Sequence, residues 1–444
     1  MDTQNNNNSK ETEMFSLSAE NFDNDKFYVV SFQGYEALNE LFNFSIDFVC
    51  KNKSLDTDTL MSSLTTFSIA RQSGEVSNFS GYPINVEQSG QFGDFAYYHV
   101  DLRPTFWKMT QLSASRIFLN KTIKDIIKEI LEDEQFLHLS NDFNFVKTDY
   151  PQQEFVMQYN ETNFDFISWI LEQNGAYFYF DQDNKNNKYM TDKLVFCDQP
   201  SSHNAISNDN NSEVTYAEIS GLDFVHRQEI IYSFRLKQSP LPRNIVVRDY
   251  DWKKPNQVIA GKADVSQNGL GTIYLTNENV ESESEANRIA KIRAEELQCH
   301  SKTYYGKSVI PTLRPGFTFK LKDHYNQKFN QEYLLTKVTH EGSQESFLTL
   351  GLGIPMLAGI NKNSNEQNHY YYRNDFECIE AKQVYHPKRK APRAEIKGVI
   401  RGFIDGAGDS SRPEVDEYGR YKVIFPFDTS GRDKGKGSCW IRRS

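Results

Sequence analysis

Hydrophobic residues alternate with polar ones along much of the chain. Four apolar side chains, Phe42, Phe44, Ile46 and Phe48, are separated by single polar residues. A period of two predicts a strand with one buried face. The same pattern covers residues 27–33, 41–49, 67–71, 78–88 and 95–102. Pro104 then ends this first unit, which we expect to be barrel-like.

The period changes to that of a helix in three places. The residues concerned are 121–133, 163–174 and 283–299. The first carries aliphatic side chains on one helical face, and the third has a stripe of alanine, isoleucine and leucine. Thr162 and Asp165 form a capping box that opens the second helix, and Gly175 ends it as a C-cap residue. Each helix is flanked by further strand patterns, so the chain as a whole is β-rich.

Further strands are expected between and after the helices. They cover residues 177–180, 193–197, 222–238, 244–250, 318–322, 332–340 and 346–352. Residues 252–255 should end the strands that precede them, and residues 361–368 read as a loop or crossover. Residues 382–393 are rich in proline, lysine and arginine, which is typical of a linker. A strand over 396–404 should begin the last domain.

The stretch Asp416–Asp428 combines turn chemistry with a strand. A turn is predicted from Asp416 to Gly419. An acidic residue at its start and a glycine that can adopt positive φ both favour a turn. Apolar residues then recur at a period of two, which predicts one buried and one mixed face. The apolar positions are Tyr421, Val423, Phe425 and Phe427. Pro426 cannot donate a ladder hydrogen bond, so this strand should be an edge strand or carry a bulge.

Length, charge and cysteines narrow the function classes. The 444 residues suffice for two to four domains, and 32 Phe and 24 Tyr favour strands. The formal charge of −10 argues against a general nucleic-acid binder. Five scattered cysteines suggest neither a disulfide framework nor a metal site, which fits a reducing cytosol. The basic tail over 431–444 is more simply a solvated loop than a phosphate site.

The ends and the apolar runs give no targeting signal. Residues 1–13 are Asn-rich and charged, so we expect disorder and no signal peptide. No apolar run approaches the ~20 residues of a membrane span, so no stable membrane insertion is expected. A protein of this kind that leaves the cell needs another route.

No catalytic, cofactor-binding or metal-binding constellation stands out. The Gly-Leu-Gly sequences at 269–271 and 351–353 lack the third glycine of a dinucleotide site and read as turns. His340-Glu341 and the other histidines lack ligand spacing. Asp416 and Glu417 are more simply turn-capping residues than an acid/base pair. The aromatic run 370–372 could stack bases or sugars, but core or subunit packing is the simpler interpretation.

The sequence motif of the terminal stretch resembles that of a known family. "DEYGRYKVIFPFD" at 416–428, followed by "SCWIR" at 438–442, resembles the signature of the oligomer-binding (OB) barrel in VgrG proteins, the spike proteins of type VI secretion systems. Tyr421 stands where the family usually has Val, and Pro-Phe replaces His-Trp before Asp428. The structural motif comprises Asp416, Tyr418, Gly419, Arg420, Lys422, Val423, Phe425, Asp428 and Trp440.

The resemblance extends over the chain from about residue 15 to residue 444, in the family's order. Matching blocks lie at 30–48, 115–131, 150–180, 245–255 and 313–342. It implies a mainly β fold: β-barrel hub domains with a few helices and α+β elements, followed by an incomplete OB-fold barrel. Family members continue into a trimeric β-helical needle, which this sequence is expected to lack.

The resemblance also implies a division into domains. A disordered start (1–14) should precede a region similar to a phage tail hub (15–381). That region would hold two barrel subdomains with a helical, α+β insert between them, followed by a linker and a truncated OB-fold spike domain. The expected bounds of these parts are 15–110 and 200–381 for the barrels, 111–199 for the insert, 382–395 for the linker and 396–444 for the spike domain.

By resemblance, the protein is a structural part of a contractile injection machine. A homotrimer would form a pseudo-sixfold ring that seats on the hexameric tube protein Hcp and contacts baseplate proteins. Through the needle it would carry a PAAR-type tip and effectors into a target cell. It would assemble in the bacterial cytoplasm and then be injected. A hub of a phage tail or an extracellular injection system stays open, whereas an enzyme and a nucleic-acid-binding OB fold are less favoured.

Overall fold

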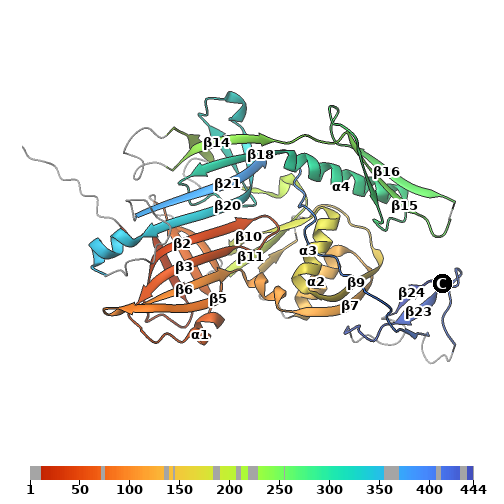
Figure 1. Cartoon of the computed structure of the whole chain (residues 1–444), viewed down its shortest axis with the longest axis horizontal. Helices are drawn as coiled ribbons and strands as arrows, with labels where there is room; N and C mark the ends of the chain where they lie inside the picture. Colours follow the sequence, from red (N-terminus) through yellow and green to blue (C-terminus); the bar gives the residue numbers. More distant parts are fainter. Residues whose placement is uncertain are drawn as a thin grey trace, which may run out of the picture.

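The structure is a computed structural model. It describes residues 12–71, 76–134, 140–143, 146–183, 191–206, 212–218, 229–254, 256–354, 370–406, 412–430 and 438–443. The expected disorder of residues 1–11, the loop at 361–368 and the first part of the strand expected over 222–238 lie outside these residues. Figure 1 shows the barrels at one end and the terminal residues at the other.

A closed six-stranded barrel forms the first part of the fold. Its strands follow the order β1-β4-β5-β6-β3-β2, and pairing of β1 with β2 closes the ring. Closure removes the exposed sheet edges that would otherwise pair with other chains. The strands are β1 (Phe15–Ala19), β2 (Phe27–Ala37), β3 (Asn43–Cys50), β4 (Thr65–Ala70), β5 (Val76–Phe92) and β6 (Phe95–Arg103), and a short helix, α1 (Thr57–Ser62), lies between β3 and β4.

A second six-stranded ring follows the order β20-β21-β18-β14-β13-β19, and pairing of β19 with β20 closes it. The short strand β12 (Asn204–Ala205) pairs in parallel with the first residues of β19. The ring strands are β13 (Glu213–Tyr216), β14 (Ile230–Gln238), β18 (Lys302–Ser308), β19 (Phe317–Lys322), β20 (Glu332–Gln344) and β21 (Tyr370–Glu380). The short helices η3 (Pro200–Ser202) and η5 (Gln327–Phe329) lie in its connections.

The two rings are joined through antiparallel pairing of β2 with β20, from Ser31↔Ser343 to Ala37↔Lys337. Phenylalanine rings fill the first barrel so closely that a Cβ on Gly34 would lie 2.3 Å from the ring of Phe44. A strand glycine at this position therefore serves a close approach of packed groups. The joint holds one continuous sheet together across both barrels.

A buried polar cluster lies at this joint. The Glu36 carboxylate accepts hydrogen bonds from Arg314 (Nη2, 3.1 Å) and lies 3.1 Å from His340 Nε2. His340 Nδ1 lies 2.8 Å from the hydroxyl of Tyr372, which also accepts a bond from Asn374. Burial by itself raises the pKa of Glu36, but Arg314 and His340 outweigh it and hold this pKa below its usual value.

An insert of helices and short strands follows the first barrel. Thr162 caps α3 by accepting a bond from the Asp165 amide, and Gly175 ends it at φ +73°, as the sequence predicted. The apolar faces of α2 and α3 join the core of the first barrel. Its elements are η1 (Thr105–Thr110), β7 (Ser113–Lys121), α2 (Ile123–Asp133), β8 (Ser140–Asp142), β9 (Gln153–Thr162), α3 (Asn163–Asn174), β10 (Tyr177–Asp183) and β11 (Thr191–Cys197).

A separate three-stranded sheet, in the order β16-β15-β17, carries the longest helix on one face (Figure 1). The helix buries Ala286, Ile289 and Ala290 against Val247 and Ile259 of the sheet. The elements are β15 (Asn244–Tyr250), β16 (Val258–Asp264), β17 (Thr272–Thr276) and α4 (Glu283–Ser301).

The terminal segment, defined here as residues 396–443, contains a small sheet in the order β22-β23-β24. Its strands are β22 (Phe403–Ile404), β23 (Tyr421–Ile424) and β24 (Cys439–Ile441). In its described part, Cys439 is the one buried apolar residue, whereas Val399 and Phe403 are largely exposed. The segment therefore lacks a core of its own in the described residues.

The mainly β fold with a few helices is confirmed, but several local predictions were wrong. Residues 346–352 are not a strand, because they contain a π-helical turn at Phe347–Gly351. A short apolar run fits either period, and here Leu348 is buried against the first barrel. β15 ends at Tyr250, as predicted for the strands before residue 252, but the sequence pattern missed β16 and β17, which follow in the same sheet. Within 396–404, only Phe403 and Ile404 form a strand.

The predicted strand after Gly419 also differs from the structure. β23 is the central strand of its sheet and stops at Ile424, so Pro426 lies beyond it and needs neither an edge nor a bulge. The alternating side chains from Tyr421 to Phe427 are half-buried, and no fully buried face forms. The reason is that a buried face requires a second packed layer, and few apolar groups of the described segment cover this sheet.

Candidate functional site

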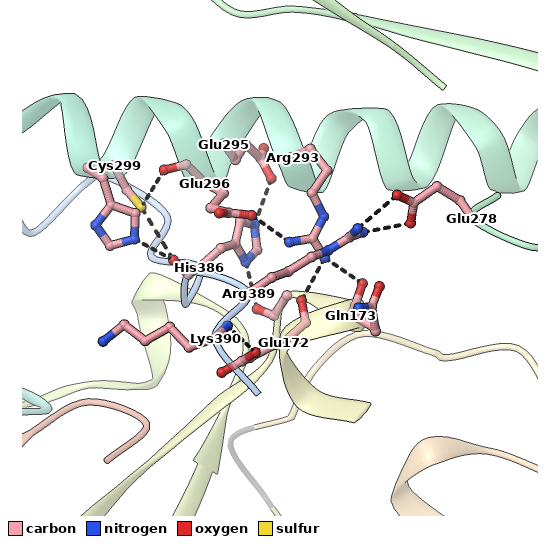
Figure 2. Close-up of polar contacts among 12 residues, drawn as sticks. Glu172, Gln173, Glu278, Arg293, Glu295, Glu296, Cys299, His386, Arg389 and Lys390 are labelled. Atoms are coloured by element: carbon pink, nitrogen blue, oxygen red, sulfur yellow. Dashed lines mark hydrogen bonds and ion pairs between the residues drawn. The ribbon is translucent and has the colours of Figure 1, made fainter. Parts of the chain in front are cut away.

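The feature that links the barrels to the terminal segment is an extended stretch at residues 382–391, here called the strap. It follows β21 without helix or strand and lies between α4 and the end of α3 (Figure 2). An extended backbone has no internal hydrogen-bond ladder, so its placement depends on contacts with its neighbours. The strap therefore decides how the terminal segment is attached to the barrels.

Two aromatic side chains fix the first half of the strap. Tyr385 is buried and packs edge-to-face on Tyr177 of β10, with ring centroids 4.8 Å apart. His386 is buried beside the end of α3, where its Nδ1 lies 2.6 Å from the Gly175 carbonyl oxygen. Its Nε2 lies 3.0 Å from the Glu295 carboxylate of α4. The ring thus ties the strap to two helices at once.

Charged groups fix the second half. Arg389 makes a two-pronged ion pair with Glu278, with both N···O distances 2.8 Å. A paired, planar contact of this kind fixes orientation as well as charge. The Glu172 carboxylate accepts the backbone amides of Lys390 (2.7 Å) and Ala391 (2.9 Å). Burial raises the pKa of Glu172 above its usual value, although these amides oppose the shift.

Arg293 joins the two helices beneath the strap. Its Nη2 donates to the backbone oxygens of Glu172 (2.6 Å) and Gln173 (2.8 Å) in the last turn of α3, and its Nη1 pairs with Glu296. A cation at the carbonyl end of a helix also complements the helix dipole. The strap therefore lies on a surface where Arg293 holds α3 and α4 together.

Arg420 is the main polar link between the terminal segment and the rest of the chain. Its Nη1 lies 3.0 Å from Glu154 of β9, and its Nε pairs with Asp416 at 2.5 Å. The guanidinium lies over the ring of Trp252, 5.2 Å from its centroid. Stacking and ion pairing together are the contacts that arginine, rather than lysine, makes well.

Two further contacts place the terminal segment on the insert. The Thr429 amide donates to the carbonyl oxygen of Ser115, at 3.0 Å. Tyr159 and Phe427 pack edge-to-face with centroids 5.0 Å apart. A cleft of about 1580 Å³ lies between these contacts and is lined by both parts, including Trp440. The segment is therefore held by a few discrete contacts around an open cleft.

The residues of the predicted motif lie together in this small sheet and its turn. Asp416 accepts the amides of Tyr418 and Arg420, and Gly419 has φ +72°, so the capping interpretation of Asp416 is correct. Lys422 lies over the Trp440 ring at 5.1 Å.

Three other motif residues have local roles. Val423 pairs with Cys439 in the ladder, Phe425 stacks on Phe427, and Asp428 accepts the Ser430 amide. Whether these residues form an OB barrel stays a prediction.

Candidate chemistry elsewhere is structural in character. In the part of the chain that the structure describes, no group of three His, Cys, Asp or Glu residues could hold a metal ion. The five cysteines are free and buried. In the aromatic run, Tyr372 is buried in the polar cluster at the joint, and the hydroxyl of Tyr371 bonds to Glu341. Among the described residues, no helix is long and apolar enough to cross a membrane.

Sequence reasoning missed the strap contacts. The composition of residues 382–393 predicts a linker, and nothing in the local pattern shows that Glu172, Glu278 and Glu295 contact it. The one available signal was the glycine at 175. A Cβ at that position would lie 2.6 Å from His386 Nδ1, so the glycine serves a close approach as well as a helix end.

Comparison with known proteins identifies a matching family and several similar proteins. A model of the phage tail baseplate hub (GPD) family matches residues 35–346. The chain is 27% identical over 417 residues to the type VI secretion system spike protein VgrG1b of Pseudomonas aeruginosa, covering 93% of this chain and 52% of the relative. For VgrG1c of the same organism the identity is 26% over 418 residues, covering 93% and 53%. The chain thus spans about half the length of these relatives.

Solved structures share the fold. The E. coli c3393 protein, described as a component of the type VI secretion system with similarity to bacteriophage T4 tail proteins, matches with a TM-score of 0.67 at 19% identity, covering 96% of this chain and 93% of that one. A 43 kDa tail protein of prophage MuSo2 from Shewanella oneidensis matches with a TM-score of 0.55 at 12% identity, covering 84% and 100%. Since the family model matches well over half of the chain, the protein belongs to the phage tail baseplate hub family.

Proposed function

We propose that this chain is the hub of a type VI secretion spike, together with the first part of the spike itself. The spike proteins among its relatives support this role over nearly the full chain. In this proposal, residues 15–381 form the hub, 382–395 the connection and 396–444 the start of an OB-fold spike domain. The proposed role of the protein is mechanical, and the proposal includes no catalytic role. The protein would assemble in the bacterial cytoplasm and leave the cell with the apparatus.

The observation that carries the proposal is the pair of closed six-stranded barrels in one chain. Three copies around an axis would present six barrels, which matches the symmetry of a hexameric tube such as Hcp. A threefold assembly with heterologous contacts closes on itself and does not grow into fibres. The β2–β20 joint favours this arrangement because it fixes the two barrels of each copy relative to one another.

The terminal segment would then lie near the threefold axis and pass the symmetry to a needle. In the described part of this segment, apolar residues such as Val399 and Phe403 are exposed, so these residues do not supply a sufficient core. A small sheet of this kind needs further strands or other chains for stability. Baseplate proteins, a PAAR-type tip and effectors are the other partners of this proposal, the last two through the needle.

Light scattering of the purified chain across a concentration series tests the assembly. A mixture of monomer and trimer supports the proposal, and a pull-down with hexameric Hcp should retain the trimer. Each subunit contact in the trimer should bury more than ~1,000 Å². A stable dimer or tetramer would contradict the proposed assembly.

A hub of a phage tail or an extracellular injection system is the second candidate. The match to the prophage tail protein over 84% of this chain favours it. The two candidates differ in the tube that they bind. Preferential binding to a phage tail tube protein over Hcp, or phage structural genes beside this one, would select the second.

A further inference from the structure

Helix α4 covers one face of the three-stranded sheet β16-β15-β17 and leaves the other face open. Val247 and Ile259 pack on the helix, and a Cβ at Gly261 would lie 2.2 Å from the Ala286 backbone. Side chains alternate between the two faces of a strand, so the neighbours of these residues lie on the opposite face. This open face, here called the outer face, includes Val246, Tyr250, Val258, Ala260, Lys262 and Tyr274.

Most of the outer face is apolar, and it is exposed to solvent. Tyr250, Val258 and Tyr274 are 57%, 52% and 68% exposed. The strand register places Tyr250 beside Val258 and Val246 beside Tyr274, so these side chains form neighbouring pairs on one surface. A sheet with one face in water normally carries polar residues on that face. An exposed apolar patch that contains tyrosines is instead typical of a protein–protein contact.

A second set of exposed apolar side chains lies on the terminal segment. Val399 is fully exposed, and Phe403 and Ile404 are 68% and 61% exposed. In the described part of the chain, most of the exposed large apolar side chains belong either to this segment or to the β16-β15-β17 sheet and its connections. Figure 1 shows the sheet and the segment at the same end of the molecule.

Within one chain these two surfaces adjoin but do not cover each other. The ring centroid of Trp252, just after β15, lies 5.2 Å from the Arg420 guanidinium and 5.0 Å from that of Arg442. Tyr418 packs edge-to-face on the same indole, with ring centroids 5.3 Å apart. The apolar residues of both surfaces nevertheless stay exposed, so they are accessible to another chain.

The symmetry of a trimer limits which surface can cover the outer face. If the outer faces of two copies met, the contact would be isologous and would produce a twofold dimer, so in a ring each outer face must meet a different surface of the next copy. A rotation about an axis from hub to spike keeps the height of every group along that axis. The partner surface must therefore lie at the same end of the molecule, and the terminal segment does so and exposes apolar residues.

On the basis of the threefold assembly proposed above, we propose that the outer face of each copy docks the terminal segment of the next copy. Val399 and Phe403 of one copy pack against Tyr250 and Tyr274 of its neighbour. The contact supplies the second packed layer that the small sheet of the terminal segment requires. Each copy gives its segment to one neighbour and receives a segment from the other, so the ring closes with every outer face covered.

Sedimentation equilibrium of the full chain over a concentration series tests the proposal. Tyr274→Glu places a charge within the contact, so the concentration at which monomer and trimer are equally populated should rise about tenfold or more. Val399→Glu changes the opposite side of the same contact and should have the same effect. Both side chains are exposed in the single chain, so both variants should keep the wild-type far-UV circular dichroism.

The matched control is Tyr325→Glu, which makes the same substitution on the connection between β19 and β20. Tyr325 is 73% exposed, similar to Tyr274, but it lies outside both surfaces. This variant should keep the wild-type concentration midpoint. A midpoint raised as much as in Tyr274→Glu would overturn the proposal, because the effect would then not be specific to the outer face.

Lysine cross-linking identifies the two surfaces directly. Lys262 lies on the outer face and Lys397 lies two residues before Val399, and both are exposed. Light and heavy-isotope-labelled chains are mixed in equal amounts, allowed to exchange and then cross-linked. Peptides that join Lys262 to Lys397 should include pairs of one light and one heavy chain, which only a contact between copies can produce.

The possible failures can be told apart. A trimer that Tyr274→Glu leaves as stable as the wild type, or an absence of mixed light–heavy pairs between Lys262 and Lys397, would overturn this docking and leave the proposed trimer intact. A wild type that stays monomeric at every concentration, or that forms a stable dimer, would contradict the threefold assembly itself and the docking with it.

Discussion

Replacing Arg314 with methionine should destabilise the barrels strongly, because Arg314 neutralises a buried carboxylate at the joint between them. The side chains of Arg314 and Glu36 are 10% and 5% exposed, and their closest N···O distance is 3.1 Å. Methionine retains most of the aliphatic volume but leaves Glu36 charged, with His340 as its remaining side-chain partner among the described residues. Removing one partner of such a buried pair costs about 3–5 kcal/mol.

The matched control is Arg373→Met on β21. Arg373 pairs with Glu341 at a similar distance, 3.0 Å, but the two side chains are 39% and 37% exposed. Water screens an exposed pair, so this change should cost no more than about 1 kcal/mol. The comparison thus keeps the substitution and a similar N···O distance, and the main difference between the two pairs is their burial.

Equilibrium unfolding in urea, followed by far-UV circular dichroism, measures both changes as shifts of the midpoint at constant slope. The double variant Arg314→Met/Glu36→Gln should recover part of the loss, because no uncompensated charge then stays buried. The reasoning fails if Arg314→Met is no more destabilising than Arg373→Met, or if the double variant is worse than the sum of its parts.

Three further outcomes follow from the described contacts. Gly175→Ala should destabilise by about 1–3 kcal/mol in thermal unfolding, because its φ of +73° and the approach of His386 both exclude a side chain; an unchanged midpoint would contradict this. The folded-state pKa of Glu36 lies below its ordinary value of 4.5, so its stabilising contribution is complete above pH 4.5 and is lost as the pH falls further. The free energy of unfolding in urea should therefore change less between pH 6 and pH 3.5 in Glu36→Gln than in the wild type. Arg420→Ala should speed chymotryptic cleavage at Tyr418 and leave the unfolding midpoint of the barrels unchanged, because Arg420 holds the terminal segment and no barrel.

The helices and their ends could be predicted from the sequence, because their signals are local. The hydroxyl of Thr162 and the amide of Asp165 are three residues apart, and the C-cap depends on the conformational freedom of Gly175 alone. The aliphatic face of α2 recurs within one helix, so its burial also follows from spacing. The turn at Asp416 and Gly419 could also be predicted, because its signal lies within four residues.

Short apolar segments could not be assigned in this way. Residues 346–352 fit a strand by composition, yet burial of Leu348 in a cluster with residues of the first barrel selects a helical turn. The mixed sequence of β16 gives a weak signal, and the helix α4 that covers it comes later in the chain. In both cases the free energy that decides the conformation comes from a partner distant in sequence.

The sequence by itself determined the β-rich class, the three main helices, the turn before β23 and, through its motifs, the family. Only the tertiary structure decided that twelve strands close into two joined rings and that the strap lies in a corner between α3 and α4. The pairing of Glu36 on β2 with Arg314, and of Glu172 with the amide of Lys390, joins residues hundreds of positions apart. Such contacts leave no local periodicity, because their free energy arises only when ring closure and helix packing have brought the groups together and excluded water.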